Sequence, residues 1–440
     1  MMAIKILLFF AGLAAGILTP LDDAMARDLS SSDALSLVLK QSQDIKKAAA
    51  NVEKMQAVLD GVNSRRLFQA DISASYVHSP DISGYNLFWP GDNITQQLQN
   101  GGIGSSSTRI PHVGTAGISA TQPLYTFGKI GYAVDMARKS VQVAATSKKL
   151  AELEMGAAAA QLYWSAKMSD ELVKIAQKSL KNTKYARDQL TAAGRANRSN
   201  LVKISADVAA REIDLADAEF SRDSAHRMLK AYAGIDDSES LALTSDFPDK
   251  FDSRPAAGIN PPEWDIYRYQ AEIYDAEKRK NYMTWLPSIS AFGKYDYQTF
   301  SLGGASELMD MYRHSANAGI SVSLSLVDWG AARHAATESA MAAIAAREDL
   351  DKSKRLKSAE YADLIQKHEH LRGQLKGLGE AKDLAEKAYS LSRDRFFAGQ
   401  TSATELSDVE RSLRQMEIAV LNAKLQILIT AANAAKYEAE

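Results

Sequence analysis

The chain has 440 residues and a formal net charge of -2 at pH 7, and 46% of its residues are hydrophobic. A chain so close to neutrality offers no global attraction for nucleic acids or anionic lipid surfaces, which disfavours nucleic-acid binding. It contains no cysteine. Disulfides, thiolate metal sites, cysteine nucleophiles and a lipid anchor on an N-terminal cysteine are therefore excluded.

Residues 1–26 have the pattern of a secretory signal peptide. Lys5 precedes an apolar run from Ile6 to Leu18, and the small residues Ala24 and Ala26 stand just before Arg27. The run is shorter than the roughly 20 apolar residues that a spanning helix needs. We therefore expect an exported chain without a transmembrane helix. Acidic residues near the cleavage site leave an uncleaved anchor as a minor alternative.

Proline placement indicates where long helices lie. None of the ten prolines falls within 124–247 or 288–440, and both stretches are rich in strong helix formers. Proline in a helix interior costs about 3 kcal/mol, so such gaps are typical of very long helices. The predicted helices are 33–66, 128–193, 198–233, 262–284, 329–397 and 402–437.

Four shorter stretches alternate between apolar and polar residues. The predicted strands are 69–79, 114–124, 287–297 and 317–327. About ten residues suffice for a tilted strand to cross a bilayer. One apolar side chain, Phe292, falls on the polar face. Strands of a soluble sheet alternate in the same way, which leaves that alternative open. Polar faces of Ser, Thr and Gly, with long polar loops at 79–113 and 298–313, favour an outer-membrane barrel.

The order of elements occurs twice along the chain. The stretches "QPLYTFGKI" (from Gln122) and "LSLVDWGAAR" (from Leu324) each lead from a strand straight into a long helix. Further on, Gly194 and Gly399 take equivalent places at the tips of two helical hairpins. The predicted domains are a signal peptide at 1–26, a first repeat at 27–234, an equatorial or linker segment at 235–261 and a second repeat at 262–440.

The sequence resembles the TolC-like outer-membrane efflux proteins. The resemblance rests on these two junctions, on "LPSIS" from Leu286 and on the tip "FFAGQTSATELSDVE" from Phe396. The resemblance covers essentially the whole mature chain. It implies a mainly α fold with a membrane β-barrel, in which each protomer of a homotrimer gives four strands to one 12-stranded barrel and long helices to a periplasmic coiled-coil tunnel. From the residues alone, four strands require further copies if they lie in the membrane, because the smallest membrane barrels have about eight strands; two or three copies stay open.

The resemblance also implies a function and partners. It predicts an outer-membrane channel of a Gram-negative bacterium that passively conducts cargo as the exit duct of a tripartite efflux or type I secretion system. A periplasmic adaptor (membrane fusion) protein, an inner-membrane RND or ABC transporter and outer-membrane lipid are the expected partners. A periplasmic coiled-coil scaffold or adaptor without a barrel is the alternative, although the duplicated strand pair argues against it.

The second tip holds the candidate gate. Gly399 suits the positive φ that ends one helix, and Ser402 to Glu405 form a capping box that starts the next. Glu405 and Asp408 are three residues apart and share a helix face. The resemblance implies that such acidic residues form rings at the periplasmic entrance, although Glu405 is also explained by the capping box alone. Family members carry a basic residue where this chain has Thr401, and that residue locks the closed entrance. The closed state of this chain is therefore expected to be held differently, and Arg195 or Arg198 on the other tip is the suggested substitute.

Two further groups of residues complete the predicted sites. The adaptor is expected to dock on the hairpin tips, at Gly194, Arg195, Gly399 and Gln400. The strand-to-helix membrane boundary is expected at Pro123, Tyr125, Phe127, Gly128, Trp329 and Gly330, where Pro123 ends strand pairing and the aromatic rings suit an interfacial girdle.

No catalytic motif is present in the sequence, and the seven histidines are scattered. His368 and His370 point in different directions if they lie on a helix, so they make a poor metal site. We therefore predict a protein that is not an enzyme and that uses no cofactor or metal.

Overall fold

The computed structural model describes residues 27–78, 112–192, 198–248, 251, 258–301 and 311–437. The predicted signal peptide, Gly194 and Arg195 lie outside the described residues, as does most of the two predicted loops. The chain divides into two compact units. The first comprises Met1–Lys47, Lys149–Pro261 and Leu356–Glu440, and the second comprises Ala48–Lys148 and Pro262–Arg355. Each unit takes residues from both predicted repeats, because long helices run from one unit into the other.

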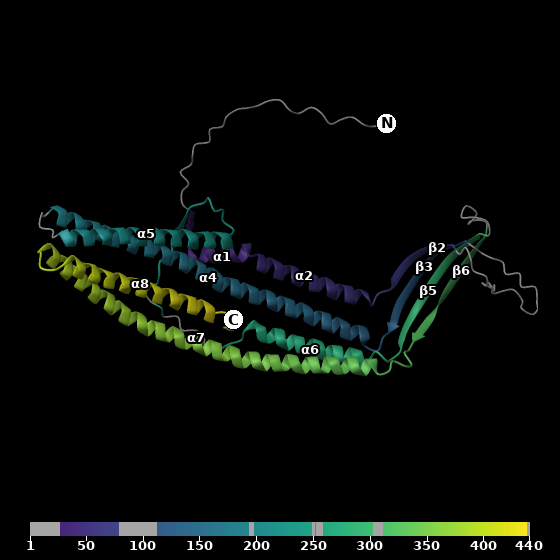
Figure 1. Cartoon of the computed structure of the whole chain (residues 1–440). Helices are drawn as coiled ribbons and strands as arrows, with labels where there is room; N and C mark the ends of the chain where they lie inside the picture. The colour runs from purple at the N-terminus through teal and green to yellow at the C-terminus, as the bar shows by residue number, and fades with distance from the viewer. Residues whose placement is uncertain are drawn as a thin grey trace, which may run out of the picture. The chain divides into compact units, whose positions relative to one another are not determined.

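The second unit contains a four-stranded antiparallel sheet in the order β2, β3, β5, β6 (Figure 1). Its strands are β2 (Gln69–His78), β3 (His112–Tyr125), β5 (Ser288–Ser301) and β6 (Met311–Ser323). The alternation of apolar and polar residues predicted the bounds of β2, β3 and β5 to within a few residues. The prediction for the fourth strand, 317–327, was wrong at both ends. Leu324 and Leu326 continue the alternation, but β5 begins at Ser288, opposite Ser323, so no ladder partner remains for them.

The predicted first helix is in fact two helices, α1 (Ser31–Gln41) and α2 (Gln43–Ser64). Ser42 separates them. Its N–H bonds to the carbonyl of Val38 and so ends α1, while its hydroxyl accepts a hydrogen bond of 3.4 Å from the N–H of Ile45 and caps α2. The Ser42 side chain satisfies the start of α2, so the helix can break at this residue. Hydrophobic periodicity did not indicate the break.

The remaining helices begin and end within a few residues of the predictions. They are α4 (Lys129–Ala192), α5 (Arg198–Ala233), α6 (Pro262–Tyr282), α7 (Ala331–Phe397) and α8 (Ala403–Ala434). α7 runs unbroken through Gly373, Gly377 and Gly379. No helix in the described parts of the chain is long and apolar enough to cross a membrane.

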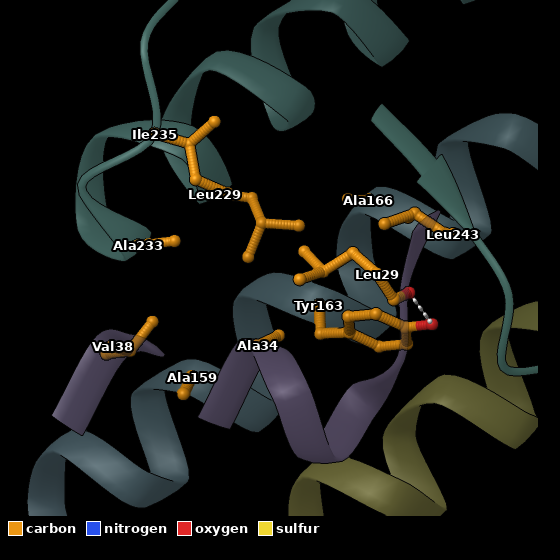
Figure 2. Packing of buried hydrophobic residues seen from close by; sticks show 10 residues of the cluster. All are labelled: Leu29, Ala34, Val38, Ala159, Tyr163, Ala166, Leu229, Ala233, Ile235 and Leu243. Carbon is orange, nitrogen blue, oxygen red and sulfur yellow. Dashed lines mark hydrogen bonds between the residues drawn. The ribbon is translucent and has the colours of Figure 1, made fainter. Parts of the chain in front are cut away.

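The core of the first unit forms where two short strands pair in parallel, β1 (Arg27–Leu29) with β4 (Leu241–Leu243). Figure 2 shows the buried residues around them, with Tyr163 of α4 in the middle. The Tyr163 hydroxyl donates to the carbonyl of Leu29 at 3.2 Å and accepts from the N–H of Ser245 at 2.9 Å. Part of the predicted linker 235–261 is therefore packed into the core, which its lack of periodicity did not indicate.

Candidate functional site

The tip between α7 and α8 is built by the residues that the sequence singled out. Gly399 has a φ of +74°, and the N–H of Gln400 bonds to the carbonyl of Arg395 at 2.9 Å, which closes the end of α7. Ser402 caps α8, because its hydroxyl accepts from the N–H of Glu405 at 3.2 Å. The second half of the predicted capping box is absent: the Glu405 carboxylate accepts from the hydroxyl of Thr401 instead.

Glu405 and Asp408 lie on the same exposed face of α8, as their spacing predicted. They line an open groove of about 440 Å³ together with Ala385 and Ala388 of α7. Asp408 forms an ion pair with Arg411 at 3.2 Å, and both side chains are mostly exposed. Such a pair is worth at most about 1 kcal/mol, so the carboxylate is free to turn toward another charge.

A buried ionic cluster on the opposite side of α8 ties it to α4 and α5. The Arg211 guanidinium of α5 lies 3.2 Å from the Glu410 carboxylate, and both side chains are at least 90% buried. Arg211 also bonds to Asp214 at 2.9 Å, Arg414 of α8 contacts the same aspartate, and the Ser179 hydroxyl of α4 donates to Glu410. Burial would raise the pKa of Asp214, but hydrogen bonds from Arg414 and Arg211 outweigh it and hold that pKa below its usual value.

Sequence reasoning missed this ionic cluster, although a signal was present. Glu410 occupies a position in the otherwise apolar seam of α8 formed by Ala403, Leu406 and Leu413. Arg211 likewise follows Ile204 and Val208 along the buried side of α5. A charge at a seam position on each of two helices is the pattern that predicts a buried pair.

The hairpins also meet nearer their tips. Ile204, Ala186, Phe396, Ala403 and Leu406 form a buried apolar cluster to which α4, α5, α7 and α8 all contribute. Beside it, the Lys203 amine donates to the Thr404 hydroxyl at 2.6 Å. Arg198, one of the two suggested substitutes for the missing basic residue, is the first residue of α5, and it forms no hydrogen bond or ion pair with the described residues of α7 or α8.

The sheet of the second unit has one apolar and one polar face. Residues in register across it include Ile72, Ile118, Tyr295 and Ala316 on the apolar face, and Ile72 is 82% exposed. Ser, Thr and Gly occupy much of the other face, as predicted, and Lys294 and Asp296 form an ion pair there at 3.0 Å. The predicted exception, Phe292, has a structural reason: its ring lies over Gly319, where an added Cβ would stand 3.3 Å from it.

Both strand-to-helix junctions adopt the same backbone. Phe127 and Gly128 have φ values of 51° and 83°, and Trp329 and Gly330 have 52° and 82°. This pair of left-handed residues redirects the chain from strand to helix without a hairpin. In the second junction Asp328 accepts hydrogen bonds from the N–H groups of Ala332 and Gly330, which lowers its carboxyl pKa. A non-glycine residue with positive φ is uncommon, and its occurrence twice marks the repeat.

One detail of the predicted boundary was wrong. Pairing does not end at Pro123, which still lies opposite Ser290; the ladder shifts register between Pro123 and Tyr125, and Tyr125 pairs with Ile289. Proline lacks an N–H donor, so an irregularity beside it is expected, but the neighbouring strand holds the ladder together.

Aromatic side chains gather at both ends of the strands. At the helical end, Tyr125 and Phe127 pack edge to face at 4.6 Å, and Trp329 is 92% exposed. At the other end, Tyr297 and Tyr312 pack with His314. Eight residues of β5 separate the two levels, from Ile289 opposite Tyr125 to Tyr297, or about 27 Å along the strand. Once the strands tilt by about 40°, this length covers about 21 Å along the bilayer normal, which with the flanking aromatic rings approaches the apolar band of about 25 Å in outer-membrane barrels.

Within the described ranges no group of three or more His, Asp or Glu side chains could hold a metal ion. The residues that gather are instead the exposed carboxylates on α8, the ionic cluster behind them and the two faces of the sheet.

Comparison with known proteins shows which family shares these features. The family model of the outer membrane efflux proteins matches residues 34–235 and 270–437. No curated protein sequence gives a significant match.

Solved structures share the fold. CusC aligns with a TM-score of 0.76 at 15% identity, covering 94% of this chain and 93% of that one. VceC of Vibrio cholerae aligns with a TM-score of 0.73 at 17% identity, covering 93% and 97%. The CmeC outer membrane channel of Campylobacter jejuni aligns with a TM-score of 0.76 at 14% identity, covering 92% and 84%. The predicted TolC-like fold is confirmed, and the chain belongs to the outer membrane efflux protein family, as a channel of the outer membrane and not an enzyme.

Proposed function

We propose that the protein is the exit duct of a tripartite efflux or type I secretion system, through which cargo passes without chemistry or energy supplied by the duct. The observation that carries the proposal is the sheet of the second unit. Its apolar face is exposed, and its edge strands β2 and β6 each pair on one side only among the described strands. In hydrocarbon an unpaired strand edge costs several kcal/mol per group, so β6 of one copy must pair with β2 of the next.

The number of copies follows from this edge and from the family. Four strands are too few to close a membrane barrel, for which about eight is the minimum. Three copies give the 12-stranded barrel of a homotrimer, as the family resemblance implies. The apolar band between the aromatic rows then faces outer-membrane lipid, and the Ser, Thr and Gly face lines the lumen.

The gate role of Glu405 and Asp408 remains a proposal that the exposed face of α8 supports. Both carboxylates are exposed, while Glu410 on the opposite side of the helix is buried. A charge fixed by burial at Glu410 orients α8 so that Asp408 points away from α5. Three copies around an axis would place a ring of carboxylates at the entrance, which favours cations.

The partners are an adaptor protein and an inner-membrane RND or ABC transporter. The tip residues Gly399 and Gln400 support the docking of the adaptor, because they form a compact turn at the end of the second hairpin. The matching residues Gly194 and Arg195 lie outside the described residues. A periplasmic scaffold without a barrel is disfavoured, because it has no use for a sheet with an exposed apolar face.

Membrane fractionation of cells expressing the full chain tests the proposal. A trimer in the outer membrane that converts to monomer on heating in detergent supports it, as does a conducting pore after reconstitution in a planar bilayer. A soluble periplasmic monomer would contradict both the barrel and the duct.

A further inference from the structure

Strand β1 begins at the residue that the predicted signal-peptide cleavage would make the N-terminus of the chain. That residue is Arg27, and only two residues later Leu29 is 1% exposed in the core of the first unit. The carbonyl of Leu29 accepts hydrogen bonds from the Tyr163 hydroxyl at 3.2 Å and from the N–H of Thr244 at 3.1 Å. Chain ends are ordered only where contacts hold them, and here such contacts lie next to the expected terminus.

Two adjacent residues receive the main chain and the side chain of Arg27. The N–H of Arg27 donates to the carbonyl of Ser240 at 2.8 Å. The guanidinium Nη1 of Arg27 lies 3.4 Å from the Glu239 carboxylate, and both side chains are 45% exposed. The main-chain nitrogen of Arg27 is therefore held beside an acidic residue at the edge of the core.

The segment that receives Arg27 is fixed by contacts of its own. Gly234 ends α5 with a φ of +67°. The Asp236 carboxylate then accepts from the N–H of Ser238 at 2.9 Å and from its hydroxyl at 2.6 Å, and the N–H of Glu239 bonds to the carbonyl of Asp236 at 3.2 Å. These bonds hold the turn without help from Arg27, so the receiving groups are in place before the chain end arrives.

The two segments that meet here carry more negative than positive charge. Their carboxylates are those of Asp28, Asp236, Asp237 and Glu239, and the basic side chains among them are those of Arg27 and Lys230, which lies 4.0 Å from Asp237. A further positive charge at this place is therefore attracted and not repelled.

We propose that Glu239 and Ser240 form a docking site for the α-ammonium group that signal-peptide cleavage creates on Arg27. Hydrolysis adds one water across the Ala26–Arg27 peptide bond and leaves a carboxylate on Ala26 and an ammonium on Arg27. An α-amino group is mostly protonated at pH 7. The nitrogen that bonds to Ser240 thus gains a charge and further N–H donors where an acceptor and a carboxylate already lie.

Cleavage then strengthens the pairing of β1 with β4. A charge-assisted hydrogen bond is about twice as strong as a neutral one, so the processed chain holds the start of β1 more firmly than its precursor does. A chain without cysteine has no lipid on its terminus, which leaves protein contacts to hold it. The inference rests on the predicted signal peptide and is independent of the proposed duct.

The reactivity of the terminal amine tests the docking site. The full chain, exported and processed in cells and purified in its native state, is treated at pH 7 with an amine-acylating reagent. Mass spectrometry of the N-terminal fragment then gives both the first residue and the rate at which its α-amine is modified. The comparison variant has Gly-Ser inserted between Ala26 and Arg27, which keeps the cleavage site and moves the amine about 7 Å along the chain.

The α-amine of the natural chain should react about tenfold more slowly than that of the extended variant, because a hydrogen bond to a charged group must first be broken. Glu239→Gln should speed the reaction of the natural terminus about threefold, since it removes the carboxylate and keeps the Ser240 carbonyl. Glu338→Gln is the matched control. It removes the same charge from an exposed position on α7 and should leave the rate unchanged.

The outcomes separate the docking site from the cleavage site. A chain that begins at Arg27 and has a protected amine supports the inference. A chain that begins at another residue overturns it, because no ammonium then lies beside Ser240. A chain that begins at Arg27 but reacts as fast as the extended variant also overturns it, although the cleavage site was correct. Equal rates in the two glutamine variants would contradict the part assigned to Glu239. None of these results depends on the oligomeric state, so the duct is tested separately.

Discussion

The buried pair of Arg211 and Glu410 makes the sharpest prediction for stability. In Glu410→Gln the shape of the side chain is kept and its charge is removed, so the guanidinium of Arg211 stays buried with one carboxylate instead of two. Its side chain is 7% exposed, so little water replaces the lost partner. Breaking a buried pair costs about 3 to 5 kcal/mol. Asp214, at 2.9 Å, still neutralises part of the charge, which places the expected cost near the lower value, about 3 kcal/mol.

Urea unfolding of the purified trimer, followed by circular dichroism at constant protein concentration, measures this cost as a shift of the midpoint. Glu212→Gln is the matched control. Glu212 pairs with Lys184 at 2.8 Å, but both side chains are about half exposed, so its loss should cost less than about 1 kcal/mol.

A double variant separates the charge from the packing. Arg211→Met with Glu410→Leu removes both charges and should recover most of the stability lost in Glu410→Gln, because apolar residues can replace a buried pair without penalty. The reasoning is refuted if Glu410→Gln costs no more than Glu212→Gln. It is also refuted if the double variant is as unstable as the single one.

Three further predictions concern the gate, a buried histidine and the sheet. Asp408→Ala should lower cation selectivity and raise conductance in a planar bilayer, whereas Gln415→Ala, also exposed on α8, should leave both unchanged; unaltered selectivity would remove Asp408 from the gate. His368 is 2% exposed, and burial, followed by the charge of Arg372, lowers its pKa below 6.5. As the pH falls, the unfolded state binds the proton before the folded state does, so the free energy of unfolding should fall below about pH 6.5. The urea midpoint should therefore depend less on pH in His368→Met. An equal pH dependence of the midpoint in both proteins would contradict this. Gly319→Val should press on the ring of Phe292 and lower the temperature at which the trimer dissociates, while Gly293→Val, where nothing lies within 4 Å, should not; equal shifts would count against the ring contact.

Much of the architecture was predictable because it is encoded locally. Proline-free stretches located the long helices, and alternation located three of the four strands to within a few residues. The tip at Gly399 and Ser402 was predicted from the residues that a helix end and a helix start require. In each case the deciding interactions lie within a few residues of chain, which is the range over which sequence patterns carry information.

Three of the corrections share one cause. The end of β6 depends on where β5 begins, the continued pairing of Tyr125 depends on Ile289, and the packing of the 235–261 segment depends on β1 and Tyr163. Each partner is far away in the sequence. A pattern read along one strand or loop cannot show whether a partner on another segment is present.

The sequence by itself determined the repeat, the positions of the long helices, the two faces of the sheet and the carboxylates at the tip, because these follow from periodicity and local capping. Only the tertiary structure decided that Glu410 is buried against Arg211 while Asp408 is exposed. That difference depends on which helix lies beside which, and it is settled by packing between segments about two hundred residues apart.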